Sequence, residues 1–233
     1  MELKQSAILI FSRSKSQEAS NKVFYSGKGK KTNEKIADAL IQNTIQVARN
    51  SGLPVFIKFT HQQFGNTFGE RLGNAMDEVF QRGFNNVIAI GNDCPSLNSE
   101  TLSKVNTILQ EKKLVIGPAI DGGLYLIGIN RKYFDKKSFA QFSWRHHTLI
   151  DDWITFASNN CISYTTLPQL EDIDDHQALS RFLNSHELFS SLRKKLEFIL
   201  ATIIQKTNSR VTCINTYFFQ NNNALRGPPS FFS

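Results

Sequence analysis

The sequence predicts an α/β fold in which helices cover both faces of a mainly parallel sheet. Short continuous apolar runs, such as residues 7–11, are typical of strands that are buried on both faces. Segments with apolar residues at helical spacing separate these runs. This alternation favours right-handed crossovers between parallel strands. In such a sheet we expect the ligand site at the carboxyl ends of the strands.

In the first half of the chain, apolar runs and helical spacings alternate. Residues 12–32 are rich in Ser, Lys and Gly, so we expect a long loop between the first strand and the first helix. Gly52 and Pro54 end that helix, and Gly83 ends the next one. The expected strands are 7–11, 55–59 and 87–90, and the expected helices are 36–48 and 68–80.

The second half continues the pattern. Asn98 is a suitable cap for a helix that begins at Ser99. A double glycine, Gly122 and Gly123, precedes a further apolar run. The expected strands are 114–116, 124–129 and 162–167, and the expected helices are 99–109, 149–156 and one that begins at 175.

The length and composition fit one domain. The chain has 233 residues, of which 40% are hydrophobic, and this is enough for a sizeable core. An apolar stripe predicts a long helix over 186–206, followed by an irregular tail. We therefore expect a nucleotide-binding domain over 1–185 and a helical extension and tail over 186–233 that packs on it.

Two observations indicate a cytoplasmic protein. No apolar run approaches the roughly eighteen residues of a membrane span, and the run at 7–11 is too short for a signal peptide. The three cysteines are odd in number and have no CxxC spacing. Neither a disulfide framework nor a zinc site is indicated.

The net charge of +7 is concentrated near the start of the chain, where residues 1–60 hold ten Lys and Arg against four Asp and Glu. This excess favours an anionic partner. Nucleic acid is not expected, because the basic residues are not interleaved with aromatics and no nucleic-acid-binding motif is present. A small phosphate-bearing ligand fits the charge, and a solvated basic surface is the alternative.

The segment 91–95 carries the strongest local signal for chemistry. Asp93 follows a buried strand, Gly91 permits close approach of a ligand, and Pro95 redirects the chain. A carboxylate in this place suits Mg²⁺ or Mn²⁺ that bridges the phosphates of a nucleotide. The alternative is an ordinary turn.

A second signal lies at 117–123. Here a strand end is followed by Asp121 and the glycines Gly122 and Gly123. Paired glycines admit a ligand closely, and Asp121 is a candidate catalytic residue that would orient or deprotonate an acceptor. Asp-Gly is also common in hairpin turns, which is the alternative reading.

Three motifs, in order, resemble the selenodomain-associated transferases. That family is similar to GT-A glycosyltransferases and to guanylyltransferases such as phospholactate guanylyltransferase. The matching residues are Gln63, Gly65 and 68–72; Gly91, 93–95 and Leu97; and 117–119, 121–123 and 125–128. Weaker agreement extends the resemblance over about residues 5–183.

The resemblance implies a GT-A three-layer sandwich with a nucleotide pocket at the carboxyl ends of the first strands. It also implies Mg²⁺ or Mn²⁺ on Asp93, with Asp172 or Asp174 as the second carboxylate. Arg71 is a candidate phosphate contact, although a Glu-Arg pair early in a helix is usually solvated surface. Trp144 is a candidate wall on the acceptor side of the pocket.

One segment departs from the family. After the first strand the family has a Lys, a Pro-Gly turn and a Lys-Thr-Arg-Leu stretch that would face phosphates, and this chain lacks them. Lys28, Lys30 and Lys31 are candidate substitutes, and a basic surface loop is the alternative. The departure raises the prospect of altered specificity or lost catalysis.

The sequence thus predicts a metal-dependent nucleotidyltransferase or glycosyltransferase with a nucleotide or nucleotide-sugar donor and a small-molecule acceptor. We favour nucleotidyl transfer, because of the resemblance to guanylyltransferases and because Gly91 stands where many sugar-transferring GT-A enzymes have the first acid of an Asp-x-Asp pair. The alternative is a non-catalytic protein that binds a nucleotide or a sugar phosphate. The acceptor and the oligomeric state are left open.

Overall fold

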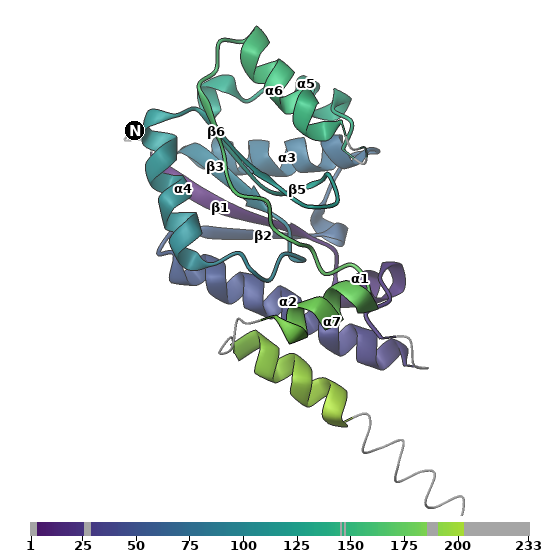
Figure 1. Ribbon diagram of the computed structural model, residues 1–233. Coiled ribbons are helices and arrows are strands. Elements are labelled where there is room, and N and C mark those ends of the chain that lie inside the picture. The colour runs from purple at the N-terminus through teal and green to yellow at the C-terminus, as the bar shows by residue number, and fades with distance from the viewer. Residues whose placement is uncertain (1–3, 26–28, 145, 147, 186–190, 203–233) are drawn as a thin grey trace, which may run out of the picture.

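The protein is described from a computed structural model that covers residues 4–25, 29–144, 146, 148–185 and 191–202. The strands of the described chain form one sheet in the order β2-β1-β3-β5-β4-β6 (Figure 1). The strands are β1 (Lys4–Ser12), β2 (Val55–Phe59), β3 (Phe84–Ile90), β4 (Leu114–Pro118), β5 (Leu124–Asn130) and β6 (Tyr164–Thr166). The helices are α1 (Lys15–Asn21), α2 (Lys30–Asn50), α3 (Phe68–Gln81), α4 (Ser99–Glu111), α5 (Lys136–Gln141), α6 (Leu149–Asn159) and α7 (His176–Asn184), with short 3₁₀ turns η1 (Thr60–Gln62) and η2 (Arg131–Tyr133).

The sheet is mostly parallel. β1 pairs in parallel with β2 and β3, and β4 pairs in parallel with β6. β5 is the exception, since it runs antiparallel to both β3 and β4. The prediction of a mainly parallel sheet is therefore confirmed, and β1 and β3 both end at the same edge.

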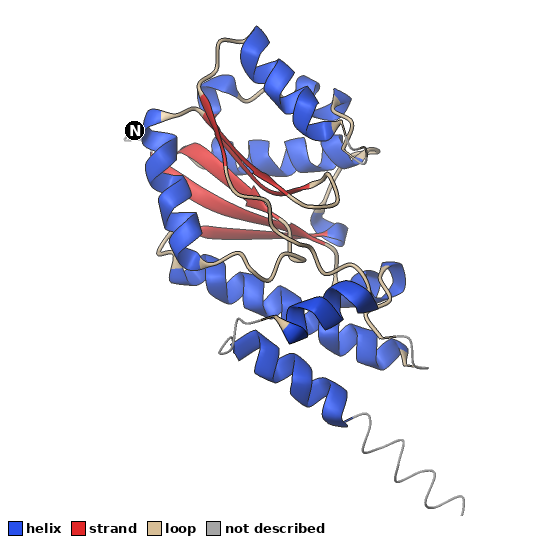
Figure 2. Ribbon diagram, in the orientation of Figure 1, coloured by secondary structure: helices blue, strands red, loops and turns tan. Residues whose placement is uncertain are grey.

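Helices cover both faces of the sheet, as Figure 2 shows. Alternation along β1 explains how the two layers form, because successive side chains of a strand point to opposite faces. Ala7 and Leu9 pack in the cluster that contains the buried residues of α3, α5 and α6. Ile8 and Ile10 pack in the cluster that contains residues of α2 and α4. The result is the three-layer α/β sandwich that the sequence predicts.

A third buried cluster lies away from the sheet. It joins Leu40 of α2 and Leu179 of α7 to Leu192 and Leu196, which belong to helical residues 191–202. These helical residues fall within the helix predicted over 186–206. Leu192 and Leu196 of the expected apolar stripe are buried, and Leu188 and Ile203 lie outside the described residues. The division of the chain at residue 185 stays a prediction.

The prediction of one long loop over 12–32 is wrong. β1 continues to Ser12, α1 occupies Lys15–Asn21, and α2 begins at Lys30. The helix α1 has no apolar stripe, because Glu18 is its one buried residue. The first turn of α2 is held by a polar contact, in which Asn33 Oδ1 accepts a hydrogen bond of 2.9 Å from the amide of Tyr25. Apolar spacing cannot reveal either feature.

None of the described helices combines the length and the apolar character that crossing a bilayer requires.

Candidate functional site

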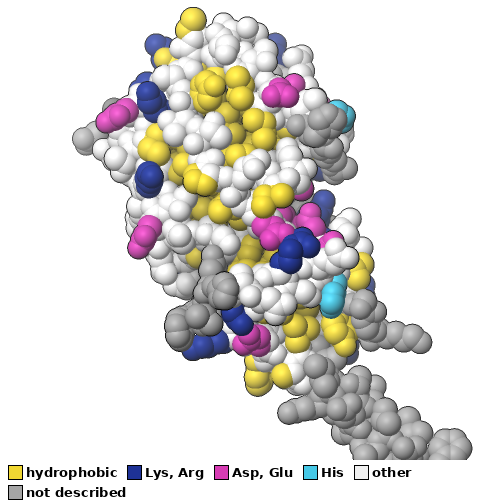
Figure 3. Space-filling view, in the orientation of Figure 1, with side chains coloured by type: hydrophobic (Ala, Val, Ile, Leu, Met, Phe, Trp, Pro, Cys, Tyr) yellow, Lys and Arg dark blue, Asp and Glu magenta, His cyan; other side chains and the backbone are white. Residues whose placement is uncertain are grey.

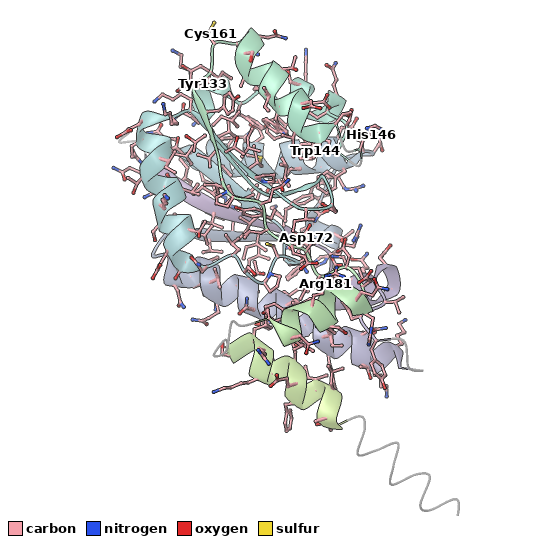
Figure 4. All side chains as sticks on the ribbon, in the orientation of Figure 1. Tyr133, Trp144, His146, Cys161, Asp172 and Arg181 are labelled. Atoms are coloured by element: carbon pink, nitrogen blue, oxygen red, sulfur yellow. The ribbon has the colours of Figure 1, made fainter. Side chains whose placement is uncertain are left out.

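A cleft of about 570 Å³ opens at the carboxyl ends of β1 and β3. Its walls come from the segment after β1, the segment after β3, the loop that precedes β5 and the segment between β6 and α7. Figure 4 places Asp172 on that last segment, between the sheet and α7, and Trp144 on the other side near α3. Figure 3 shows acidic side chains gathered beside a basic one in this part of the surface.

A backbone hydrogen bond brings three carboxylates into the cleft. The amide of Ile173 donates to the carbonyl oxygen of Asp93 at 2.7 Å. Ile173 itself is buried, so its side chain anchors the segment in the core. Its two neighbours, Asp172 and Asp174, consequently line the cleft together with Asp93.

Lys22 lies at the centre of these acids. Its Nζ is 2.8 Å from Asp93 Oδ2 and 2.6 Å from Asp174 Oδ1. The Lys22 side chain is only 10% exposed, whereas Asp93 is 29% and Asp174 is 53% exposed, so solvent screens the pair with Asp174 more than the pair with Asp93. Burial lowers the pKa of Lys22, but the carboxylates of Asp93, Glu18 and Asp174 outweigh it and raise the pKa overall. The Lys22 side chain is therefore a firmly charged cation.

Asp172 has a different environment. Within the described chain its Oδ1 atom is buried and has no hydrogen-bond partner. Burial is the largest cause that raises the pKa of Asp172, from 3.8 to about 8, and the charges of Asp93, Asp121 and Asp174 raise it further. The environment of Asp172 therefore favours the neutral form of this carboxyl more than that of an ordinary aspartate.

Glu18 is the most deeply buried acid of the site. Its side chain is 4% exposed, and its Oε2 lies 3.7 Å from Lys22 Nζ and 3.7 Å from Arg13 Nη1. No hydrogen bond reaches this oxygen from the part of the chain that the structure describes. Burial raises the pKa of Glu18, while Lys22 and Arg13 lower it in part.

The glycine-rich loop before β5 forms the opposite wall. Asp121 Oδ1 accepts a hydrogen bond of 2.8 Å from the amide of Gly123. Gly122 has φ +92°, a left-handed conformation that favours glycine. A Cβ atom at Gly123 would lie 3.0 Å from Asp121 Oδ1. The loop is therefore built to leave its backbone close to the cleft.

Aromatic side chains close the far side of the cleft. The indole Nε1 of Trp144 donates a 2.6 Å hydrogen bond to the carbonyl of Phe139, and its ring centroid is 5.2 Å from that of Phe68. Arg71 of α3 also lines the cleft, and its Nε is buried without a hydrogen-bond partner among the described residues. A guanidinium with an unused donor is suited to contact an anion.

Most of the residues that the sequence singled out line this one cleft. They are Arg71, Gly91, Asp93, Asp121, Gly122, Gly123, Trp144, Asp172 and Asp174. Lys30 and Lys31 are exposed on the first turn of α2 and are not part of the lining, and Lys28 lies outside the described residues. Their role as phosphate contacts stays a prediction.

Sequence reasoning missed three charged residues of the cleft, namely Arg13, Glu18 and Lys22. One signal was available, because Glu18 and Lys22 are four residues apart and this spacing pairs opposite charges on a helix. The assignment of residues 12–32 to a loop hid that signal.

The carboxylate oxygens of the cleft are suitable ligands for a hard divalent cation, but they are not already arranged around one point as a complete set of metal ligands. Asp93 and Asp174 both have an oxygen within hydrogen-bond distance of one nitrogen, and Asp172 has a buried oxygen without a partner. Oxygen ligands of this kind are those that Mg²⁺ and Mn²⁺ prefer. Within the described residues, no three His, Cys, Asp or Glu side chains are already arranged to hold a metal ion.

The strand order, the antiparallel β5 and the cleft at the carboxyl ends of β1 and β3 define a protein with a GT-A-like α/β fold. Residues 12–146 match the family described as "Uncharacterized protein conserved in bacteria (DUF2064)", which is more than half of the chain. The chain belongs to this family. No curated protein matches its sequence significantly.

A solved structure supports the fold assignment. The chain is similar to a "putative nucleotide-diphospho-sugar transferase" from Desulfovibrio desulfuricans G20, with a TM-score of 0.75 and 23% identity over 87% of this chain and 98% of that one. At this identity the likeness shows the fold alone.

Two further likenesses are weaker. Rv0371c from Mycobacterium tuberculosis H37Rv, in complex with manganese, has a TM-score of 0.48 and 12% identity over 79% of this chain and 100% of that one. A cytidylyltransferase from Leptospira borgpetersenii has a TM-score of 0.47 and 13% identity over 88% of this chain and 96% of that one. Neither likeness supports an argument about this chain.

Proposed function

We propose that this protein is a metal-dependent transferase that binds a nucleotide or a nucleotide sugar in the cleft at the ends of β1 and β3. The observation that carries the proposal is the grouping of Asp93, Asp172 and Asp174 at one end of a cleft that also holds Arg13 and Arg71. Acids alone would repel phosphates. Acids that hold a divalent cation, next to the guanidinium groups of two arginines, form a site for phosphates.

Asp93 and Asp174 are the residues that would hold Mg²⁺ or Mn²⁺, with Asp172 as a third oxygen ligand after loss of its proton. A bound divalent cation would neutralise charge on the phosphates and on the leaving group. Because burial raises the pKa of Asp172, a cation bound at this site would favour the ionised carboxylate and release the proton that the neutral form holds.

The remaining residues of the cleft would bind and orient the two substrates. Arg13 and Arg71 face the space where phosphates would lie, and their guanidinium groups are suited to bidentate contacts with phosphate oxygens. Gly91, Gly122 and Gly123 permit close approach of the ligand. Asp121 also lines the cleft and would orient the acceptor.

Within this class we favour nucleotidyl transfer. Gly91 carries no carboxylate, and a Cβ atom there would lie 2.9 Å from Asp93 Oδ1, so a side chain at this position would require the Asp93 carboxylate to move. Asp93 is therefore the one acid at the end of β3, and the Asp-x-Asp pair of many sugar-transferring relatives is missing. In the favoured reaction, an acceptor phosphate oxygen attacks the α-phosphorus of a nucleoside triphosphate, and pyrophosphate leaves.

Product identity tests this proposal. The protein is incubated with Mg²⁺, a panel of acceptor phosphates and alcohols, and either nucleoside triphosphates or nucleotide sugars, and the products are followed by phosphorus NMR. We expect pyrophosphate from a triphosphate. Release of a nucleoside diphosphate from a nucleotide sugar alone would replace nucleotidyl transfer with glycosyl transfer.

A second candidate function is non-catalytic binding of a nucleotide or a sugar phosphate. The position of the Lys22 ammonium between Asp93 and Asp174 favours it, because the acids then have an internal counter-charge. This candidate predicts nucleotide binding that is the same with Mg²⁺ and with EDTA, and no turnover of any donor.

A further inference from the structure

Lys22 occupies the place where a metal ion would meet its ligands. The nearest oxygens of Asp93 and Asp174 lie 2.8 Å and 2.6 Å from Lys22 Nζ. A divalent cation bound by these same oxygens would stand within a few ångströms of the ammonium. Two like charges so close in a shielded cleft repel each other strongly. The ammonium and the metal ion therefore cannot share these two carboxylates.

The same helix offers Lys22 a second position. Glu18 lies one helical turn before Lys22, and its Oε2 is 3.7 Å from Lys22 Nζ, beyond hydrogen-bond distance. Because no described group donates a hydrogen bond to this oxygen, it is free to accept one from the ammonium. Lys22 can thus leave Asp93 and Asp174 without becoming an unpaired buried charge, which would be costly.

We propose that Lys22 and a divalent cation exclude one another at Asp93 and Asp174, so that metal binding turns the Lys22 ammonium toward Glu18 and toward a phosphate group in the cleft. This inference rests on the proposed function, and it adds a positioning role for Lys22, the residue that follows α1. In the empty protein Lys22 neutralises the acids. In the loaded protein it faces the ligand.

Exclusion of this kind has a thermodynamic consequence. Metal alone must displace an ion-paired ammonium, so its affinity is lowered by the strength of those ion pairs. A phosphate group that accepts the displaced ammonium recovers part of that free energy. Metal and phosphate would then bind with positive coupling, and Lys22 would be the residue that couples them.

The first test is calorimetric titration with Mn²⁺ and no nucleotide, in the full chain and in the Lys22→Met variant. Met keeps most of the side-chain volume and removes the charge. We expect Lys22→Met to bind Mn²⁺ at least about tenfold more tightly than the parent. Lys15→Met is the matched control, because Lys15 lies on the same helix and pairs with Asp38 instead, at 3.7 Å. Its affinity should stay within about twofold of the parent.

The second test uses the unaltered chain, so it does not depend on how a variant folds. Lysine acetylation by a small amine-reactive reagent is measured residue by residue with mass spectrometry, with Mn²⁺ and with EDTA. Lys22 is 10% exposed and paired with Asp93 and Asp174, so we expect slow acetylation in EDTA and a severalfold change in that rate with Mn²⁺, because the ammonium then has different partners. Lys15, which is 59% exposed, should react equally in both.

The outcomes separate this inference from the proposed function. Mn²⁺ binding that is equal in the parent and in Lys22→Met, with unchanged acetylation of Lys22, would overturn the inference and leave the metal site standing. No Mn²⁺ binding in either protein would overturn both. Tighter binding in Lys22→Met together with a metal-dependent change in the acetylation of Lys22 would support both.

Discussion

The amide of Ile173 donates a 2.7 Å hydrogen bond to the carbonyl oxygen of Asp93. This bond joins the segment before α7 to the end of β3, and it explains why acids from distant parts of the sequence meet. Because Ile173 is buried, the segment is held by the core as well as by the bond. The carboxylates of the cleft are therefore placed by a rigid connection and not by a mobile loop end.

Replacing Asp93 by Asn should lower the affinity for Mn²⁺ at least about tenfold and leave the fold intact, because a neutral amide keeps the shape but is a poor ligand for a hard cation. Calorimetric titration measures the affinity, and circular dichroism checks the fold. Asp151→Asn is the control, since Asp151 is an exposed acid in the first turn of α6. If the Asp93 variant binds Mn²⁺ as the parent does, Asp93 is not a metal ligand.

Asp172 should make the metal-free protein less stable as the pH rises. Its pKa is about 8 in the folded chain against an ordinary value of 3.8, so the folded state holds an extra proton between these values. The free energy of unfolding therefore falls from about pH 4 to pH 8. Asp172→Asn removes the titrating group, so the variant should gain stability relative to the parent over that range.

Urea unfolding in EDTA at about pH 5, 7 and 8.5 measures this difference. Parallel pH profiles for the parent and Asp172→Asn would show that Asp172 does not have a raised pKa. Addition of Mn²⁺ should reduce the pH dependence of the parent, because a nearby cation favours the ionised carboxylate.

Arg13 should contribute to phosphate binding, whereas Lys30 and Lys31 should contribute little. Arg13 lines the cleft, and both lysines lie outside its lining. With GTP as a probe at low salt, Arg13→Ala should weaken binding about tenfold, as expected for loss of a charge-assisted hydrogen bond. The double variant Lys30→Ala/Lys31→Ala should change it by less than about twofold. The reverse ranking would restore the lysines as the phosphate contacts.

Gly69 should be intolerant of a side chain. A Cβ atom there would lie 2.2 Å from the carbonyl oxygen of Phe139 and 2.5 Å from Trp144 Nε1, which are themselves hydrogen-bonded. Gly69→Ala should therefore destabilise the protein by about 1–3 kcal/mol. Gly73→Ala in the same helix is the control, because its closest neighbour is Cγ of the flexible Lys136 side chain at 3.2 Å.

Urea unfolding of both variants measures the effect. Gly73→Ala should be neutral or stabilising by up to about 1 kcal/mol, since Ala has the higher helix propensity. Equal stability of the two variants would show that Trp144 and the backbone of Phe139 shift at little cost to make room for the added methyl group.

The sequence alone determined the architecture and two walls of the cleft. Continuous apolar runs mark buried strands, and the alternation of Ile8 and Leu9 between two helical layers follows directly from strand geometry. The loops at 91–95 and 117–123 follow such strands. Their place at one edge of the sheet could thus be predicted from the order of strands and helices along the chain and from the right-handed crossovers between parallel strands. These features depend on local patterns, and local patterns are visible in one sequence.

Only the tertiary structure decided which charges meet. α1 buries Glu18 and no apolar residue, so no periodic signal indicates it, and Lys22 was missed with it. Lys30 and Lys31 are candidate phosphate contacts on sequence grounds, with a basic surface loop as the alternative, and the first turn of α2 leaves them exposed, outside the cleft lining. A buried ion pair depends on both partners and on the backbone bonds that hold them, such as the bond from Ile173 to Asp93. Those partners are far apart in sequence. Ion pairs between distant residues follow no repeating sequence pattern, so the sequence alone does not predict which charged residues will pair.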